Sequence, residues 1–194
     1  RKKGGRLCYA REGESKFHSL FTGCTCLSPL GSNLAIALAA LDARVFVQRG
    51  RKVETMTMAE LYATAWRTPT AHHSLRDDDL ILRIEVPAPP QGRSAYLQVA
   101  ERSDFDWALV SCAASARIVD GKLQQARIVL GAVAPIPWQA DAANAALEGK
   151  PVTTATAERA ADLLLQEARP FGDNAYKIPI ARALVRRTLM KLVA

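Results

Sequence analysis

The chain has 194 residues, enough for one medium domain or two small ones; 49% are hydrophobic and 23% are charged. No apolar run approaches the about 20 residues of a membrane-spanning helix and no secretory signal is visible, so we expect no membrane association and a cytoplasmic location. The net charge is +7, concentrated in residues 1–17 (six basic, two acidic) and 177–194 (five basic, none acidic). Because no aromatic residues alternate with these basic ones, the pattern favours docking against other subunits over nucleic-acid binding.

The first half of the chain alternates between irregular and regular segments. Residues 1–31 are rich in glycine and charge and are predicted to be irregular. Ser32 or Asn33 then caps a predicted helix in SNLAIALAALDA. ARVFVQ and KVETMTM are predicted strands joined by a tight turn, MAELYATA is a short helix, and a further strand runs from Leu80 to Val86. The proline-rich segment 87–92 ends that strand and is the best domain boundary in the sequence.

The second half predicts a three-stranded antiparallel meander followed by helices. Strands are expected over residues 94–102, 107–119 and 123–134, with VDGK as a hairpin turn between the last two. Helices are expected in WQADAANAALEG, TATAERAADLLLQEA and IPIARALVRRTLMKLVA. The last of these has an apolar stripe made of Ala181, Leu184, Val185, Thr188, Leu189 and Leu192. A small sheet covered on one face by helices is an α+β arrangement.

Residues that could carry chemistry are few. The sequence has no GxGxxG after a strand, no GxxxxGK[ST], no HExxH and no GxSxG, which argues against a self-contained hydrolase. Cys8, Cys24 and Cys26, with His18 between them, are soft ligands for iron–sulfur or zinc. Their spacing fits neither a CxxC zinc site nor a ferredoxin run, so the spacing alone favours unligated thiols in a loop over a metal site. Cys112 lies in an apolar strand and is predicted to be a core residue.

A charged and aromatic cluster, ERSDFDW, interrupts the meander between its first two strands. It contains Arg102, Asp104 and Asp106 beside Phe105 and Trp107. One interpretation is a solvated turn with weak Arg–Asp pairs. The other is a polar rim beside a flat aromatic ligand, and the two aromatic side chains favour burial against a partner or a cofactor.

The order of four segments resembles a known family. SNLAIALAALDARV, LRDDDLILRIEVPAPP, SAYLQVAERSDFDWALVSCAASARI and ARIVLGAVAPIPWQADAANAALEGK together resemble the FAD-binding medium subunit of the molybdenum hydroxylases, which include xanthine dehydrogenase and carbon monoxide dehydrogenase. The resemblance covers residues 18–194. It implies that residues 32–90 are the second half of a flavin-binding α/β subdomain. Residues 93–194 would be the C-terminal domain, with three strands and a three-helix layer.

The resemblance also implies a function. The chain would be an electron-transfer subunit that receives electrons from [2Fe–2S] clusters in a small partner subunit and passes them through FAD to an acceptor such as NAD or oxygen. Substrate oxidation would take place at a molybdenum cofactor in a large molybdopterin-binding subunit, so no catalytic residue is assigned to this chain. A structural subunit that keeps the fold without the cofactor is the alternative.

Individual residues follow from the same resemblance. Ser32 and Asn33 occupy the family's Ser-Asp position beside the flavin's polar chain, where Asn33 carries no charge. Ile81 corresponds to an apolar side chain against the flavin, and Gln98 stands where a flavin-contacting Lys is common. The RSDFDWA tip, residues 102–108, would be held against the flavin domain.

Two further features of the sequence bear on cofactors. The family's glycine-rich pyrophosphate loop is missing, so the N-terminal half of the flavin domain is an expected partner, and this chain alone should bind FAD weakly or not at all. Residues 1–31 resemble an insertion in the branch containing 4-hydroxybenzoyl-CoA reductase, where the flavin subunit carries an extra [4Fe–4S] cluster. That resemblance makes Cys8, Cys24 and Cys26 candidate ligands.

Overall fold

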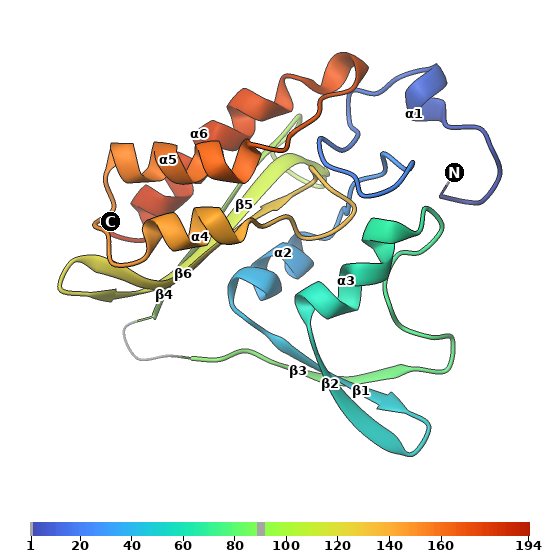
Figure 1. Cartoon of the computed structure of the whole chain (residues 1–194), viewed down its shortest axis with the longest axis horizontal. Helices are drawn as coiled ribbons and strands as arrows, with labels where there is room; N and C mark the ends of the chain where they lie inside the picture. Colours follow the sequence, from blue (N-terminus) through green and yellow to red (C-terminus); the bar gives the residue numbers. More distant parts are fainter. Residues whose placement is uncertain (1, 89–91) are drawn as a thin grey trace.

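Two three-stranded antiparallel sheets and their covering helices form the chain, as the computed structural model in Figure 1 shows for residues 2–88 and 92–194. The first sheet has the order β2-β1-β3 and the second the order β4-β5-β6, which confirms the expected α+β class. The strands are β1 (Arg44–Arg49), β2 (Lys52–Thr57), β3 (Leu80–Glu85), β4 (Gly92–Ala100), β5 (Ala108–Val119) and β6 (Lys122–Gly131). The helices are α1 (Tyr9–Glu12), α2 (Asn33–Ala40), α3 (Met58–Arg67), α4 (Asp141–Leu147), α5 (Thr154–Leu165), the 3₁₀ turn η1 (Gly172–Asn174) and α6 (Lys177–Lys191).

The second sheet is covered on both faces, whereas the sequence predicted helices on one face only. Figure 1 shows α4, α5 and α6 on one side of the sheet and α2 on the other. Val110 and Cys112 of β5 belong to the core under α4–α6, while Ala113, the next residue, packs in a core with Ile36 of α2. Because consecutive strand residues point to opposite faces, small apolar residues at nearly every position of β5 suit burial on both sides.

A close approach of α2 to this sheet depends on Gly131. A Cβ atom placed on Gly131 would lie 2.6 Å from Cγ1 of Ile36, so a side chain there would push the helix away. The helix begins at Ser32, whose Oγ accepts a hydrogen bond from the N–H of Ala35 at 3.2 Å. Ser32, the first of the two capping candidates, is therefore the N-cap.

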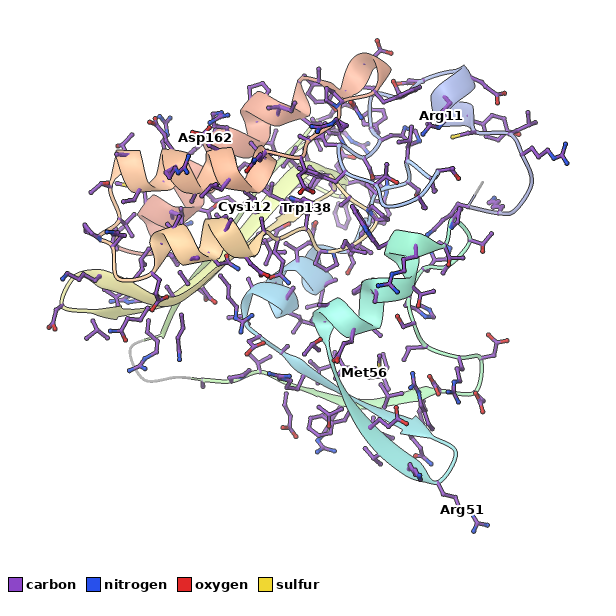
Figure 2. The ribbon with its side chains drawn as sticks, viewed as in Figure 1. Arg11, Arg51, Met56, Cys112, Trp138 and Asp162 are labelled. Atoms are coloured by element: carbon purple, nitrogen blue, oxygen red, sulfur yellow. The ribbon has the colours of Figure 1, made fainter. Side chains whose placement is uncertain are left out.

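The first sheet is covered mainly over its central strand. Val45 and Val47 of β1 are fully buried in a core with α2 and α3, but all six residues of the edge strand β3 are exposed. The β1–β2 hairpin projects from the molecule, and Figure 2 shows Arg51 at its tip extending away from the rest of the chain. Both edges and one side of this sheet are thus uncovered by the described residues.

The N-terminal segment is largely irregular, as predicted, apart from the four-residue α1, and it lies on the C-terminal domain. The backbone N–H groups of Leu20 and Phe21 donate to the carbonyl of Val133 at 2.8 and 3.0 Å. The Phe21 ring stacks on Trp138, with ring centroids 3.9 Å apart, and Trp66 of α3 lies 5.5 Å from Trp138. This aromatic cluster joins three parts of the chain into one core.

The other predicted features of the C-terminal domain are confirmed. Asp120 and Gly121 both have positive φ, 50° and 71°, as a two-residue Asp-Gly hairpin turn requires. Cys112 is fully buried and lies with Trp138 in the interior between sheet and helices (Figure 2). The apolar stripe of α6 is buried at all of its positions: Ala181, Leu184, Val185, Thr188, Leu189 and Leu192. Over the described ranges, none of the helices has both the length and the apolar character needed to cross a bilayer.

Candidate functional site

Two of the predicted site residues meet where α2 begins. Asn33 Nδ2 donates a hydrogen bond to Gln98 Oε1 at 2.9 Å, across 65 positions of sequence. The hydroxyl of Tyr96 donates to the same oxygen at 2.8 Å. Ser32 lies beside them, but its hydroxyl is already used by the helix cap. With two donors on its oxygen, Gln98 has a fixed amide orientation, and within the described chain its Nε2 group has no hydrogen-bond partner.

Ile81 lies in the other sheet, apart from this amide pair. It is paired with Val47 of β1, and its side chain is 41% exposed. Ile84, opposite Val45, is similarly exposed. Both isoleucines therefore lie on the same face of the sheet as Val45 and Val47, the face that α2 and α3 cover at β1. Neither of the two large cavities next to α2 is lined by Asn33 or Ile81. The described residues alone therefore do not enclose Ile81 and the amide pair in one pocket.

The tip between β4 and β5 is exposed rather than covered. Phe105 is fully exposed and Trp107 is 75% exposed, although the Trp107 ring lies against Gly31, where a Cβ atom would come within 2.7 Å of it. Asp106 accepts hydrogen bonds from the backbone N–H groups of Arg102 (3.0 Å) and Trp107 (2.9 Å), and these bonds hold the pKa of its carboxyl below the ordinary value. The expectation that this tip is held against the flavin domain is not met within the chain, since no described residue covers Phe105.

A cavity of about 580 Å³ lies between this tip and the segment that precedes α2. Its lining includes His18, Leu30, Trp107 and Leu109. His18 Nδ1 is buried and has no hydrogen-bond partner among residues 2–88 and 92–194. Burial, together with the nearby charge of Lys177, lowers the pKa of His18, which keeps its imidazole neutral. No sequence pattern predicts this cavity, because its walls come from four segments that are distant in the chain.

The three candidate cysteine ligands are not gathered into a metal site. Cys8 and Cys26 are buried and Cys24 is half-buried, and all are free thiols. Cys8 packs with Leu27, while Cys26 Sγ accepts the backbone N–H of Ser28 at 3.5 Å. In the part of the chain that the structure describes, no group of three or more His, Cys, Asp or Glu side chains could hold a metal ion. This arrangement does not fit a [4Fe–4S] ligand set.

Comparison with known proteins gives a consistent result. The family model described as CO dehydrogenase flavoprotein C-terminal domain matches residues 95–192. The chain is 32% identical over 192 residues to the aldehyde oxidoreductase FAD-binding subunit PaoB of Escherichia coli K12, covering 98% of this chain and 56% of the relative. It is 30% identical over 119 residues to the carbon monoxide dehydrogenase medium chain of Hydrogenophaga pseudoflava, covering 59% and 42%.

Solved structures agree in fold. Carbon monoxide dehydrogenase from Hydrogenophaga pseudoflava, in a form lacking the Mo-pyranopterin moiety, aligns with a TM-score of 0.74 and 27% identity over 84% of this chain and 56% of that one. Quinoline 2-oxidoreductase from Pseudomonas putida 86 aligns with a TM-score of 0.69 and 23% identity over 98% of this chain and 64% of that one. The chain spans about half the length of the curated relatives it matches.

Proposed function

We propose a function for this chain from its family membership. The chain belongs to the family described as CO dehydrogenase flavoprotein C-terminal domain. The chain forms one wall of an FAD site in the flavoprotein subunit of a molybdenum hydroxylase. The observation that carries this proposal is the hydrogen-bonded pair of Asn33 and Gln98, which joins the start of α2 to β4. The resemblance to the family implies that both positions lie beside the flavin. The relatives that match the chain include FAD-binding subunits of aldehyde oxidoreductase and xanthine dehydrogenase.

The chemistry of these residues fits part of an FAD molecule. The Asn33 Oδ1 atom and the Gln98 Nε2 group suit the hydroxyl-rich chain of the cofactor, since amides both accept and donate hydrogen bonds. Exposed apolar side chains on β3, including Ile81, suit one face of an aromatic ring system. The described residues offer no glycine-rich loop for the two phosphates. We therefore assign the phosphate-binding half of the site to the N-terminal half of the flavin domain, which would be a partner of this chain.

The role of the chain in the reaction is to bind and orient. FAD, when bound, supplies the ability to accept electrons singly from iron–sulfur donors and to deliver them to an acceptor such as NAD or oxygen. The amide pair would orient the polar chain, and β3 with α2 would exclude water from one side of the ring. The [2Fe–2S] clusters and the molybdenum cofactor belong, in this proposal, to small and large partner subunits.

One observation favours the alternative of a subunit without cofactor. Asn33 and Gln98 hydrogen-bond to each other, so part of their bonding capacity is satisfied with no ligand. Both are also uncharged at positions where Asp and Lys are usual in the family that the chain resembles. A subunit that kept the fold but did not bind the cofactor could retain two amide side chains that hydrogen-bond to each other.

Flavin binding by the assembled complex separates the two. The variants Asn33→Ala and Gln98→Ala are each expected to weaken FAD binding about tenfold, the effect of one lost hydrogen bond of about 1.4 kcal/mol. Gln48→Ala is the matched control, since Gln48 is an exposed glutamine of the other sheet that bonds only to the carbonyl of Gly50. Flavin absorbance and fluorescence titrations give the affinities. A complex that contains no flavin, or variants with unchanged affinity, would reject the proposal.

Iron analysis of the same complex tests the [4Fe–4S] expectation separately. If Cys8, Cys24 and Cys26 bind a cluster, the complex should contain more iron than the [2Fe–2S] clusters of its small subunit account for, and a complex with the Cys26→Ala variant should contain less. Equal iron content in the parent and Cys26→Ala complexes would mean that the cysteines are structural thiols.

A further inference from the structure

A second large cavity lies at the C-terminal end of α2, at the opposite end of the helix from Asn33. Its volume is about 580 Å³, and its lining includes Leu41 and Asp42 from the end of the helix, Arg93 and Ser94 from β4, and Arg117 and Arg127 from β5 and β6. An eight-residue helix is about 12 Å long, so this cavity is about one helix length from the amide pair. Nothing in the flavin assignment uses these residues.

Arg117 is the unusual member of this cavity. Its side chain is half-buried, and its Nε atom is buried without a hydrogen-bond partner in the described part of the chain. It forms no ion pair with any described residue. In the strand register Arg117 lies opposite Gly92, so no side chain of β4 fills the space beside it. A buried Nε atom without an acceptor is costly, and a ligand that supplies acceptors would remove that cost.

The other charges of the cavity leave a positive excess. Arg127 is paired with Asp42 at 3.0 Å, and Asp42 is also 3.6 Å from Arg44, so this carboxylate is already shared by two arginines. On the α4 side, Glu148 accepts the backbone N–H of Gln125. Arg93 is exposed and is paired with Ala116 of β5, so it lies on the opposite face of the sheet from Arg117. On the face of Arg117 the cavity therefore holds two arginines, Arg117 and Arg127, and the single carboxylate of Asp42.

We propose that this cavity is a phosphate-binding site, in which Arg117 neutralises a phosphate group and Ser94, which lies on the same face of the sheet, donates a hydrogen bond to it. A phosphate carries a charge between −1.5 and −2 near neutral pH, which the excess positive charge of Arg117 and Arg127 over Asp42 attracts. The planar fork of donors on an arginine suits phosphate oxygens, and charge-assisted bonds of this kind are the strong ones. The phosphate would belong to a small phosphomonoester, because the two phosphates of FAD are assigned to the partner half of the flavin domain; this choice of source rests on the proposed function.

Inorganic phosphate is the probe that tests the site. Titrations of the purified chain, by calorimetry and by thermal unfolding, are made at constant ionic strength with chloride as the reference anion. We expect saturable phosphate binding, an increase in Tm beyond that given by chloride, and at least tenfold weaker binding in Arg117→Gln. Arg159→Gln, an exposed arginine of α5 that lies outside the cavity, should bind phosphate as the unchanged chain does.

A structural effect of the substitution is separated from loss of the site. Because Arg117→Gln removes a charged group whose Nε atom is buried without an acceptor, its Tm without phosphate should equal or exceed that of the parent chain. Ser94→Ala should also weaken phosphate binding. A parent chain that responds to phosphate no more than to chloride, or an Arg117→Gln variant with an unchanged response, would overturn the proposal.

Competition titrations then identify the compound that supplies the phosphate group. Displacement of phosphate by FAD but not by riboflavin would mean that FAD phosphate enters this cavity, and would overturn the assignment of both FAD phosphates to the partner half of the flavin domain. Displacement by neither would support a small phosphate compound as the ligand. If the chain does not bind phosphate but Gln98→Ala weakens FAD binding as expected, the phosphate site is rejected and the flavin assignment is kept. If the chain binds phosphate but the complex contains no flavin, the flavin assignment is rejected and the phosphate site is kept.

Discussion

Replacing Lys177 by methionine tests how the buried amine at the start of α6 ties the N-terminal segment to the C-terminal domain. Lys177 is 1% exposed, and its Nζ donates hydrogen bonds to the carbonyls of Phe17 and Ala132, each at 2.9 Å. Burial lowers the pKa of Lys177 from its ordinary 10.5 to about 8. A neutral amine has two N–H donors, which is the number of carbonyls that it meets here.

The sign of the pH dependence follows from these two pKa values. Between pH 8 and pH 10.5 the unfolded chain holds the proton that the folded chain has released, so the free energy of unfolding rises with pH. At about 1.4 kcal/mol per pKa unit, the increase contributed by Lys177 between pH 7 and pH 10 is about 2.5 kcal/mol. Lys177→Met has no such proton, so the stability advantage of the parent chain over the variant should grow by that amount.

Urea unfolding followed by tryptophan fluorescence at pH 7, 8, 9 and 10 gives the free energies. The control is Lys191→Met, an exposed lysine at the other end of the same helix, whose difference from the parent should stay constant with pH. A Lys177→Met difference that is constant over this range, or that shrinks as pH rises, would refute the reasoning.

Three further predictions concern stability and reactivity. Trp138→Ala should lower the free energy of unfolding by about 3–5 kcal/mol, measured by urea titration, because it removes a buried ring that stacks on Phe21 and donates to the carbonyl of Leu164. Thr57→Ala should cost about 1 kcal/mol in the same assay, since Thr57 and Glu60 form the capping box of α3, and a loss below the error of the measurement would contradict this. Burial raises the pKa of the Cys112 thiol to about 12, so in the folded chain it should resist alkylation at pH 8 until urea exposes it; rapid labelling of the native protein would disprove that.

Local patterns in the sequence were sufficient to predict most of the elements. The alternation in β5 and the Asp120-Gly121 turn gave the meander, and the spacing of apolar residues gave α6, because these signals depend on near neighbours only. The cover of α2 on the second sheet was missed. Its signal, the small Ala113 on the face opposite Cys112, has meaning only once the partner helix is known.

The polar groups that matter most were the hardest to predict. Asn33 and Gln98 were chosen by resemblance, and their contact across 65 residues has no trace in spacing or composition. Lys177 looked like one of several surface charges on a basic helix, although its first turn faces the N-terminal segment and buries the amine. Arg117 is one member of an alternating strand, and only the register shows that Gly92 leaves no β4 side chain beside it.

The stacking of Phe21 on Trp138 has a practical consequence for dividing the protein into pieces. The family match begins at residue 95, yet Leu20 and Phe21 complete the interior of the domain that follows it, and Trp66 closes the same cluster from α3. A polypeptide cut at residue 95 would lose three large apolar side chains from its interior and present the bare indole of Trp138 to water. Recombining this domain with other flavoproteins would therefore require transferring residues 18–31 along with it.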